Sequence, residues 1–303
     1  MTERVATLAN LVCDELGQPV DPRVKDMALA IAKRHAAAST GVLFYGSCLR
    51  QAELDGLMLD FYLVVSDYRA AYDAGWMALL NRLLPPNVFP FEFKGLMAKY
   101  AVLSESDFDR LCSSRTRNVS VWARFAQPSR LVWYKDEPAR RRLLDAVCEA
   151  APALLSAARP MLPDVVSPLE LWRGSFALTY GAELRAERSG RALSVVDSEP
   201  ARYERFTAPA LAAAGIVLDA PVEFSRRRQS RLAWKRRKIE GKTLTILRLV
   251  KASLTYAGGI DYLAWKINRH AGAAIVIKPW QRRWPIIGAL TLLPRLLRGG
   301  AVH

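Results

Sequence analysis

The feature of this chain that most constrains its fold is a glycine–serine turn that follows a mainly apolar run. An acidic residue then lies inside the next apolar run. Residues 41–46 end at Gly46, and Ser47 follows directly. Residues 58–65 are rich in aromatic and β-branched side chains, and Asp60 is their one charged residue. Runs of this kind predict buried strands. We therefore expect two neighbouring strands that bring the turn and the carboxylate together.

Transfer of a nucleotide is the chemistry that this arrangement suits. A tight glycine turn lets backbone N–H groups and a serine hydroxyl approach a triphosphate, and a nearby carboxylate can hold the divalent ion that neutralises developing charge. The pattern resembles that of the polymerase-beta-like nucleotidyltransferase fold. That superfamily usually has a second carboxylate two residues after the first, where Tyr62 stands here. A β-turn beside an unrelated capping Asp is the alternative that this motif alone leaves open.

The remaining patterns predict a mixture of helices and strands, as in an α/β or α+β core. Helical spacing occurs in residues 23–38, 67–84 and 138–158, and strand-like runs occur in residues 89–93, 95–103 and 131–134. Ser104 resembles a helix N-cap. Two prolines make residues 159–163 the best linker candidate, and the chain beyond them is mostly helical in pattern.

The charge balance indicates a negatively charged partner. Lys and Arg total 44 against 29 Asp and Glu, which gives a net charge of +15. Nucleotides, nucleic acid and an anionic membrane surface all fit this charge. Basic residues are densest at 226–242, near Phe224 and Trp234. That stretch is either a solvated helix face or a surface for anionic lipid, with RNA as the other candidate.

The end of the chain has the composition of a membrane-interface segment. Trp280 and Trp284 flank two arginines, immediately before the apolar run 286–297. This run is too short for the roughly 20 residues that a membrane span needs, so we expect it to lie on a bilayer rather than cross it. A helix packed on the protein's own core is the alternative.

Several features predict a reduced, cytoplasmic protein. The four cysteines are widely separated and form no CxxC pair, which indicates neither a zinc ribbon nor a disulfide framework. The N-terminus lacks the pattern of an export or import signal. We therefore expect a cytoplasmic protein, peripheral on the inner face of the cytoplasmic membrane.

Several short motifs, in order along most of the chain, resemble one family of enzymes. They are Tyr45-Gly-Ser47, Met58-Leu-Asp-Phe61 with Asp67, Lys99-Tyr-Ala-Val-Leu-Ser104, Thr179-Tyr-Gly-Ala-Glu-Leu-Arg185, and Lys251 with Ala257-Gly258. The chain is similar to a bacterial-style member of the mitochondrial translocator-maintenance type of phosphatidate cytidylyltransferase. That family is also apolar at the position of Tyr62, whereas it has Gly at Ala101 and Asp at Glu183.

The resemblance implies an α+β fold and a specific reaction. The expected parts are a polymerase-beta-like nucleotidyltransferase domain at 1–160, a mainly helical, winged-helix-like domain at 161–255, and an amphipathic, membrane-associating segment at 256–303. The implied reaction transfers CMP from CTP to phosphatidate with Mg²⁺, giving CDP-diacylglycerol and pyrophosphate. No nucleic acid partner is expected.

Each candidate site residue has an expected role. Asp60 is expected to bind the metal and, with Lys99, to act in catalysis. Nucleotide binding is expected of Gly46, Ser47, Lys99 and Tyr100, and lipid phosphate binding of Arg185 and Lys251. The other metal carboxylate is Asp67, Glu92 or Glu183, and the residue pattern does not choose among them.

Two alternatives stay open at this point. One is a nucleotidyltransferase with another acceptor, and the other is a basic RNA-binding module, although no recognisable RNA-binding motif is present. His35 and His270 have neither metal-ligand spacing nor a catalytic partner nearby, so we expect packing or surface roles for both.

Overall fold

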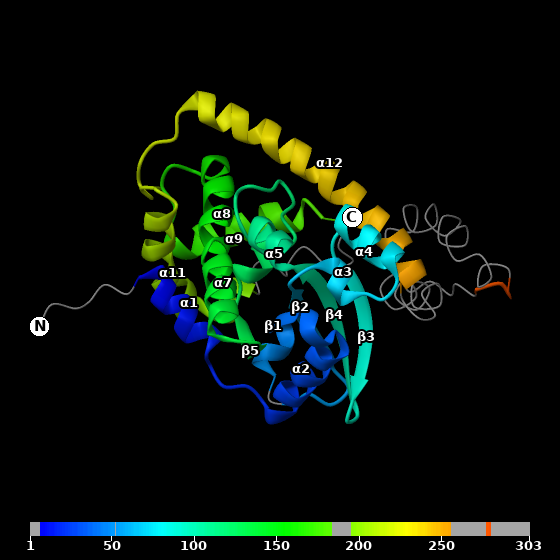
Figure 1. Ribbon diagram of the computed structural model, residues 1–303. Helices are drawn as coiled ribbons and strands as arrows, with labels where there is room; N and C mark the ends of the chain where they lie inside the picture. Colours follow the sequence, from blue (N-terminus) through cyan, green and yellow to red (C-terminus); the bar gives the residue numbers. More distant parts are fainter. Residues whose placement is uncertain (1–6, 52, 184–194, 256–276, 280–303) are drawn as a thin grey trace, which may run out of the picture.

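The structure, a computed structural model, describes residues 7–51, 53–183, 195–255 and 277–279 (Figure 1). Its centre is a five-stranded sheet with the strand order β3-β4-β2-β1-β5. The strands are β1 (Ser39–Tyr45), β2 (Met58–Val65), β3 (Asn87–Phe93), β4 (Leu96–Ser104) and β5 (Ser129–Tyr134). The pair β2–β4 is parallel and the other pairs are antiparallel, so the sheet is mixed.

The strand predictions are confirmed, and two predicted helices divide in two. Residues 67–84 form α3 (Tyr68–Ala71) and α4 (Gly75–Leu83), and residues 138–158 form α7 (Glu137–Cys148) and α8 (Ala150–Ala158). Pro152 explains the second division, because proline lacks the N–H that a continuous helix would need there and is tolerated only in a first turn. Ser104 caps α5 (Glu105–Cys112) as expected, accepting a hydrogen bond from Asp107 N at 3.2 Å.

The two faces of β2 pack against different parts of the protein. Phe61 and Leu63 point to the side covered by α2 (Pro22–Arg34), whereas Tyr62 and Val64 point into the larger helical core. Figure 1 shows α2 on one side of the sheet and α7 and α8 on the other. Because side chains alternate along a strand, Asp60 lies on the same face as Tyr62. The carboxylate therefore faces the helical half of the molecule.

One continuous core joins the sheet to the helices that follow it. The remaining helices are α1 (Leu8–Leu16), α6 (Trp122–Phe125), α9 (Pro168–Tyr180), α11 (Pro200–Ala213) and α12 (Phe224–Thr255). A single cluster of buried apolar residues includes Leu8 of α1, Tyr62 of β2 and Trp234 of α12. Beyond β5 the described residues form helices and no strand, which confirms the mainly helical expectation, and strands for a wing are not found among them.

The predicted linker at 159–163 is not an exposed linker. Arg159 is only 3% exposed, and its guanidinium donates hydrogen bonds to the carbonyls of Leu218 at 3.2 Å and Asp164 at 2.9 Å. A short 3-10 helix, η3 (Arg159–Met161), turns the chain at this point. The prolines therefore mark a tight turn whose backbone carbonyls are bound by a buried arginine, and the core continues across it.

Helix α12 spans the molecule from the helical half to the edge of the sheet (Figure 1). Trp234 Nε1 donates to the Ala157 carbonyl at 2.9 Å, and further along α12 Arg248 Nε donates to the Pro85 carbonyl at 2.9 Å. Between these points Gly241 packs directly on the backbone of Ala182. A stripe of residues at helical spacing thus fastens α12 to both halves.

We predict that Gly241→Ala destabilises the protein. A Cβ at this position would lie 2.2 Å from the Ala182 carbonyl oxygen, which is backbone and cannot turn aside. The expected loss is about 2 kcal/mol in the free energy of unfolding, measured by urea denaturation, because overpacking outweighs the helix-propensity gain of alanine.

Gly181→Ala is the matched control for this prediction. Its Cβ would meet nothing closer than 3.5 Å, and its backbone φ is −70°, which alanine adopts freely. Equal stability of the two alanine variants would contradict the close approach of α12.

Candidate active site

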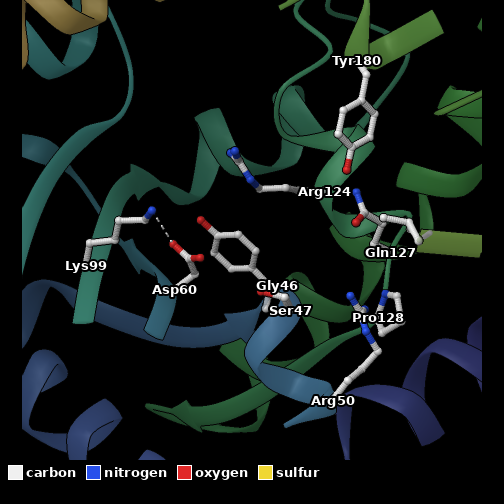
Figure 2. A pocket seen from close by; sticks show the side chains of 11 residues that line it. Gly46, Ser47, Arg50, Asp60, Lys99, Arg124, Gln127, Pro128 and Tyr180 are labelled. Atoms are coloured by element: carbon white, nitrogen blue, oxygen red, sulfur yellow. Dashed lines mark ion pairs between the residues drawn. The ribbon is translucent and has the colours of Figure 1, made fainter. Parts of the chain in front are cut away.

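A cavity of about 180 Å³ lies where the sheet meets the helical half (Figure 2). It is lined by the ends of β1, β2 and β4 and by residues of α6, α9 and the adjoining loops: Tyr45, Gly46, Ser47, Arg50, Asp60, Lys99, Arg124, Gln127, Pro128, Tyr180 and Val195. The structure therefore brings together the four residues at the centre of the predicted site, Gly46, Ser47, Asp60 and Lys99.

Gly46 makes the turn that the site requires. Its φ of 97° and ψ of −169° fall in a backbone region that is essentially restricted to glycine. A Cβ there would lie 3.4 Å from Asp60 Oδ2, so the turn passes close to the carboxylate. Ser47 then begins the 3-10 helix η2 (Ser47–Arg50). The backbone and the serine hydroxyl consequently line the same cavity as Asp60.

The register of the sheet sets the neighbours of Asp60. Asp60 is paired with Tyr45 on β1 and with Lys99 on β4. Lys99 Nζ lies 3.1 Å from Asp60 Oδ1, as the dashed line in Figure 2 marks. This contact lacks hydrogen-bond geometry, and Asp60 Oδ1 is buried without any hydrogen-bond partner. A buried carboxylate oxygen in this state is suited to receive a cation.

Positive charge dominates the cavity wall. In the part of the chain that the structure describes, Asp60 is the one acidic residue that lines it, against Arg50, Lys99 and Arg124. The Arg124 guanidinium lies 5.4 Å from the centre of the Tyr45 ring, and its Nη1 donates to the Tyr62 hydroxyl at 3.3 Å. Figure 2 shows this guanidinium directed toward the side where Asp60 and Lys99 lie. The wall is therefore suited to a substrate with several negative charges.

Arg124 stays cationic although it is half-buried. Burial acts to lower its pKa, but the pKa is raised overall by Tyr45, Tyr62 and the carboxylates of Glu183 and Asp60. Sequence reasoning missed Arg124, and Arg50, Gln127 and Tyr180 as well. The signal for Arg124 was its place among apolar residues in Trp122–Phe125, where a cation is unusual unless it faces a cleft or a partner.

Tyr100 does not line the cavity, which corrects the expectation that it binds nucleotide. Its neighbour Lys99 points into the cavity, so alternation along β4 directs Tyr100 to the other face of the sheet. There it is buried, and its hydroxyl lies 3.2 Å from His35 Nε2. His35 also contacts the Ala71 carbonyl, and burial lowers its pKa. A packing role for His35 is confirmed.

Two of the three carboxylates proposed as a further metal ligand lie away from Asp60. Asp67 is the N-cap of α3, accepting from Arg69 N at 2.7 Å. It follows Asp60 by seven residues, which is roughly 20 Å along an extended chain. Glu92 is exposed on the edge strand β3. The expectation that Asp67 or Glu92 completes the metal site is therefore wrong.

Of the three carboxylates, Glu183 is the one whose charge acts on a residue of the cavity wall. It is buried, and its charge raises the pKa of Arg124 and opposes the lowering of the pKa of Arg248 that burial causes. It does not line the cavity itself. Among the described residues no group of three or more His, Cys, Asp or Glu side chains is arranged to hold a metal ion.

Arg185, His270 and the whole of 256–276 and 280–303 lie outside the described residues, so the expectations for them remain predictions. These include the amphipathic segment with Trp280 and Trp284. None of the helices in the described ranges is long and apolar enough to cross a membrane.

Lys251 does not reach the cavity, which corrects its expected role in phosphate binding. Its side chain is 5% exposed, and the ammonium donates to the carbonyls of Leu84 and, at 2.7 Å, Pro86. Burial, with a smaller effect from Arg248, lowers the pKa of Lys251 to about 7. Its position indicates a structural role, attaching α12 to the loop between α4 and β3.

Comparison with known proteins identifies no family. No protein-family model matches the chain, and no curated protein matches it. Among solved structures, it is similar to the crystal structure of a nucleotidyltransferase-like protein from Exiguobacterium sibiricum 255-15, with 12% identity over 91% of this chain and 92% of that chain. The TM-score is 0.29, which is too low to support a functional argument. The cavity itself must carry that argument.

Lys251 leads to a prediction about stability and pH. The unfolded pKa of lysine is about 10.4, so between pH 7 and pH 10 the unfolded chain binds more protons at this residue than the folded chain does. Stability should therefore rise with pH across this window, by up to about 1.4 kcal/mol per unit from Lys251. Lys251→Met should flatten the rise, as measured by urea denaturation at pH 7.0, 8.5 and 9.5. Parallel curves for the two proteins would contradict the prediction.

Proposed function

We propose that this protein is a Mg²⁺-dependent nucleotidyltransferase that transfers CMP from CTP to phosphatidate. The observation that carries the proposal is the Asp60 carboxylate, which lies beside a glycine–serine turn in a cavity that Arg50, Lys99 and Arg124 also line. Its buried Oδ1 makes no hydrogen bond and has Lys99 Nζ at 3.1 Å. A triphosphate with a divalent ion would satisfy both the carboxylate and the surrounding positive charge.

The residues present fit a bound Mg²⁺. This ion prefers oxygen ligands and commonly uses one or two carboxylates, with water and substrate phosphate completing its shell. Asp60 offers a carboxylate, and the Ser47 hydroxyl lines the same cavity. When bound, the ion would neutralise negative charge on the triphosphate.

The protein's own side chains would then position the triphosphate and stabilise its charge. The turn at Gly46 and Ser47 allows phosphate oxygens to approach the backbone closely. Lys99 contacts Asp60 now, and it is close enough to move to a phosphate once a cation is bound there. Arg124 and Arg50 also line the cavity and add positive charge. A preorganised set of cations of this kind stabilises charge that develops during phosphoryl transfer.

The composition of the cavity wall favours a phosphate acceptor over a hydroxyl acceptor. Among the described residues, no histidine lines the cavity, and the one carboxylate that does is the proposed metal ligand. A hydroxyl nucleophile would need a general base, whereas a phosphate monoester is already anionic near pH 7. Its oxygen can attack the α-phosphorus of CTP as the bond to pyrophosphate breaks. The choice of phosphatidate among such acceptors, and of CTP among triphosphates, rests on the family resemblance.

The direct test is an assay with purified protein, labelled CTP, Mg²⁺ and phosphatidate. We expect a chloroform-soluble cytidine product, and we expect Asp60→Asn to abolish it, because the substitution removes the charge at the metal site with little change in size. The melting temperature of Asp60→Asn should match that of wild type. Near-normal turnover of this variant with Mg²⁺ would contradict the proposed site, and product from hydroxyl acceptors alone would contradict the acceptor.

Arg124 provides a second prediction for the same reaction. Since Asp60 is the one carboxylate among the described residues of the cavity wall, we propose one bound metal ion, with the Arg124 guanidinium, which donates to the Tyr62 hydroxyl, supplying further positive charge. Arg124→Gln should lower kcat by about 10²–10³-fold, the effect typical of removing one donor to a developing charge. Steady-state kinetics at saturating Mg²⁺ measures this.

Tyr62→Phe is the matched control, because it removes one hydrogen bond of Arg124 and leaves the guanidinium in place. Its kcat should fall less than about tenfold, in keeping with the small net value of one hydrogen bond. If the two variants showed equal decreases in kcat and equal decreases in melting temperature, Arg124 would be a structural residue only.

A further inference from the structure

The outward face of α12 combines positive charge with large exposed apolar side chains. Seven basic residues of the helix are exposed: Arg226, Arg228, Arg231, Lys235, Arg236, Lys238 and Lys242. Phe224, Leu232 and Ile239 stand among them and are 78%, 52% and 69% exposed. We call this set the α12 outer face. Isolated apolar residues on a surface are common, but their regular placement within a basic helix face is not.

Acidic residues do not balance this charge. Glu240 is the one acidic residue within α12, and it pairs with Arg117 at 2.9 Å on another part of the protein. The opposite side of the helix is fastened to the core by Trp234 and Gly241. Trp234 is therefore not the aromatic residue that a partner of this surface would meet; Phe224 takes that position. The outer face is held rigidly and points away from the protein.

The geometry points to an anionic lipid bilayer as the partner of the α12 outer face. Basic side chains would bind lipid headgroups while Phe224, Leu232 and Ile239 enter the boundary with the acyl chains, as in helices that lie in the membrane interface. RNA fits the charge, and bases could stack on Phe224 or on the arginines, but such binding gives the exposed aliphatic side chains of Leu232 and Ile239 no role. The partner proposed here is therefore a membrane.

This surface lies near the cavity. The inner side of α12 contacts Ala182 and Glu183 through Gly241, and the charge of Glu183 acts on Arg124 in the cavity wall. A helix is about 10–12 Å across, so a bilayer on the outer face would lie close to the site. Under the proposed function, on which this step rests, the surface would hold the enzyme next to a lipid acceptor.

Vesicle flotation with the full-length protein tests the inference. The probes are phosphatidylcholine vesicles with and without 30% anionic phospholipid, and a single-stranded RNA of about 30 nucleotides in a gel shift. The charge variant combines Arg228→Gln, Lys235→Gln and Arg236→Gln. Its matched control combines Lys25→Gln, Lys33→Gln and Lys135→Gln, three exposed lysines away from α12. A third variant combines Leu232→Gln with Ile239→Gln.

We expect wild type to float with anionic vesicles only. Each basic residue at an anionic surface contributes about a fivefold factor, so the charge variant should lose roughly 100-fold in partition coefficient beyond any loss in its control. The apolar variant should also lose binding. The inference would be overturned if the charge variant floated with anionic vesicles as well as wild type does. It would also be overturned if the apolar variant floated normally and the charge variant lost RNA binding, because that result would indicate a nucleic-acid surface.

A second substrate separates this inference from the proposed function. Short-chain phosphatidate that stays in solution does not need vesicle attachment, so all three variants should turn it over at the wild-type rate. Failure of the proposed function would appear as no turnover with either form of phosphatidate while flotation persists. Failure of the inference would appear as unchanged flotation of the α12 variants with turnover intact.

Discussion

The pairing of β2 with β1 on one side and β4 on the other is the constraint on which the site depends. An antiparallel register places Tyr45 beside Asp60, and a parallel register places Lys99 on its other side. Because strand side chains alternate, a slip of one residue in either pair would turn Asp60 toward α2. The apolar residues of the opposite face, such as Phe61, resist such a slip because they would lose their core.

Burial of charge is the second constraint, and the protein meets it in two ways. In the helical half, two buried arginines are bound by their own chain: Arg159 binds backbone carbonyls, and Arg202 forms a buried ion pair with Glu15. In the cavity, Asp60 Oδ1 makes no hydrogen bond and pairs with the Lys99 ammonium at 3.1 Å. A partly buried carboxylate beside several cations in a cavity is the kind of arrangement that a charged ligand can complete.

Helix α12 links the stability of the fold to its surface chemistry. Its inner side must approach the backbone of Ala182 so closely that only glycine fits at position 241, and it covers the core with Trp234. The same packing leaves the basic and apolar outer face directed to solvent. A rigid helix presents such side chains without the ordering cost that a flexible segment would incur on binding.

Sequence periodicity by itself determined the strands, their order along the chain and the meeting of Gly46, Ser47 and Asp60, because these depend on local pattern and on the need of one turn for glycine. It also placed Lys99 on a strand. It did not separate Lys99 from Tyr100, exclude Asp67 and Glu92, or identify Arg124. Those outcomes depend on which face of the sheet each side chain takes and on how far apart elements lie in space.

Lys251 shows the same limit, since only the packing of α12 against the Leu84–Pro86 loop decides that its ammonium binds carbonyls instead of phosphate. Local pattern specifies which residues are buried, whereas burial partners are set by long-range packing.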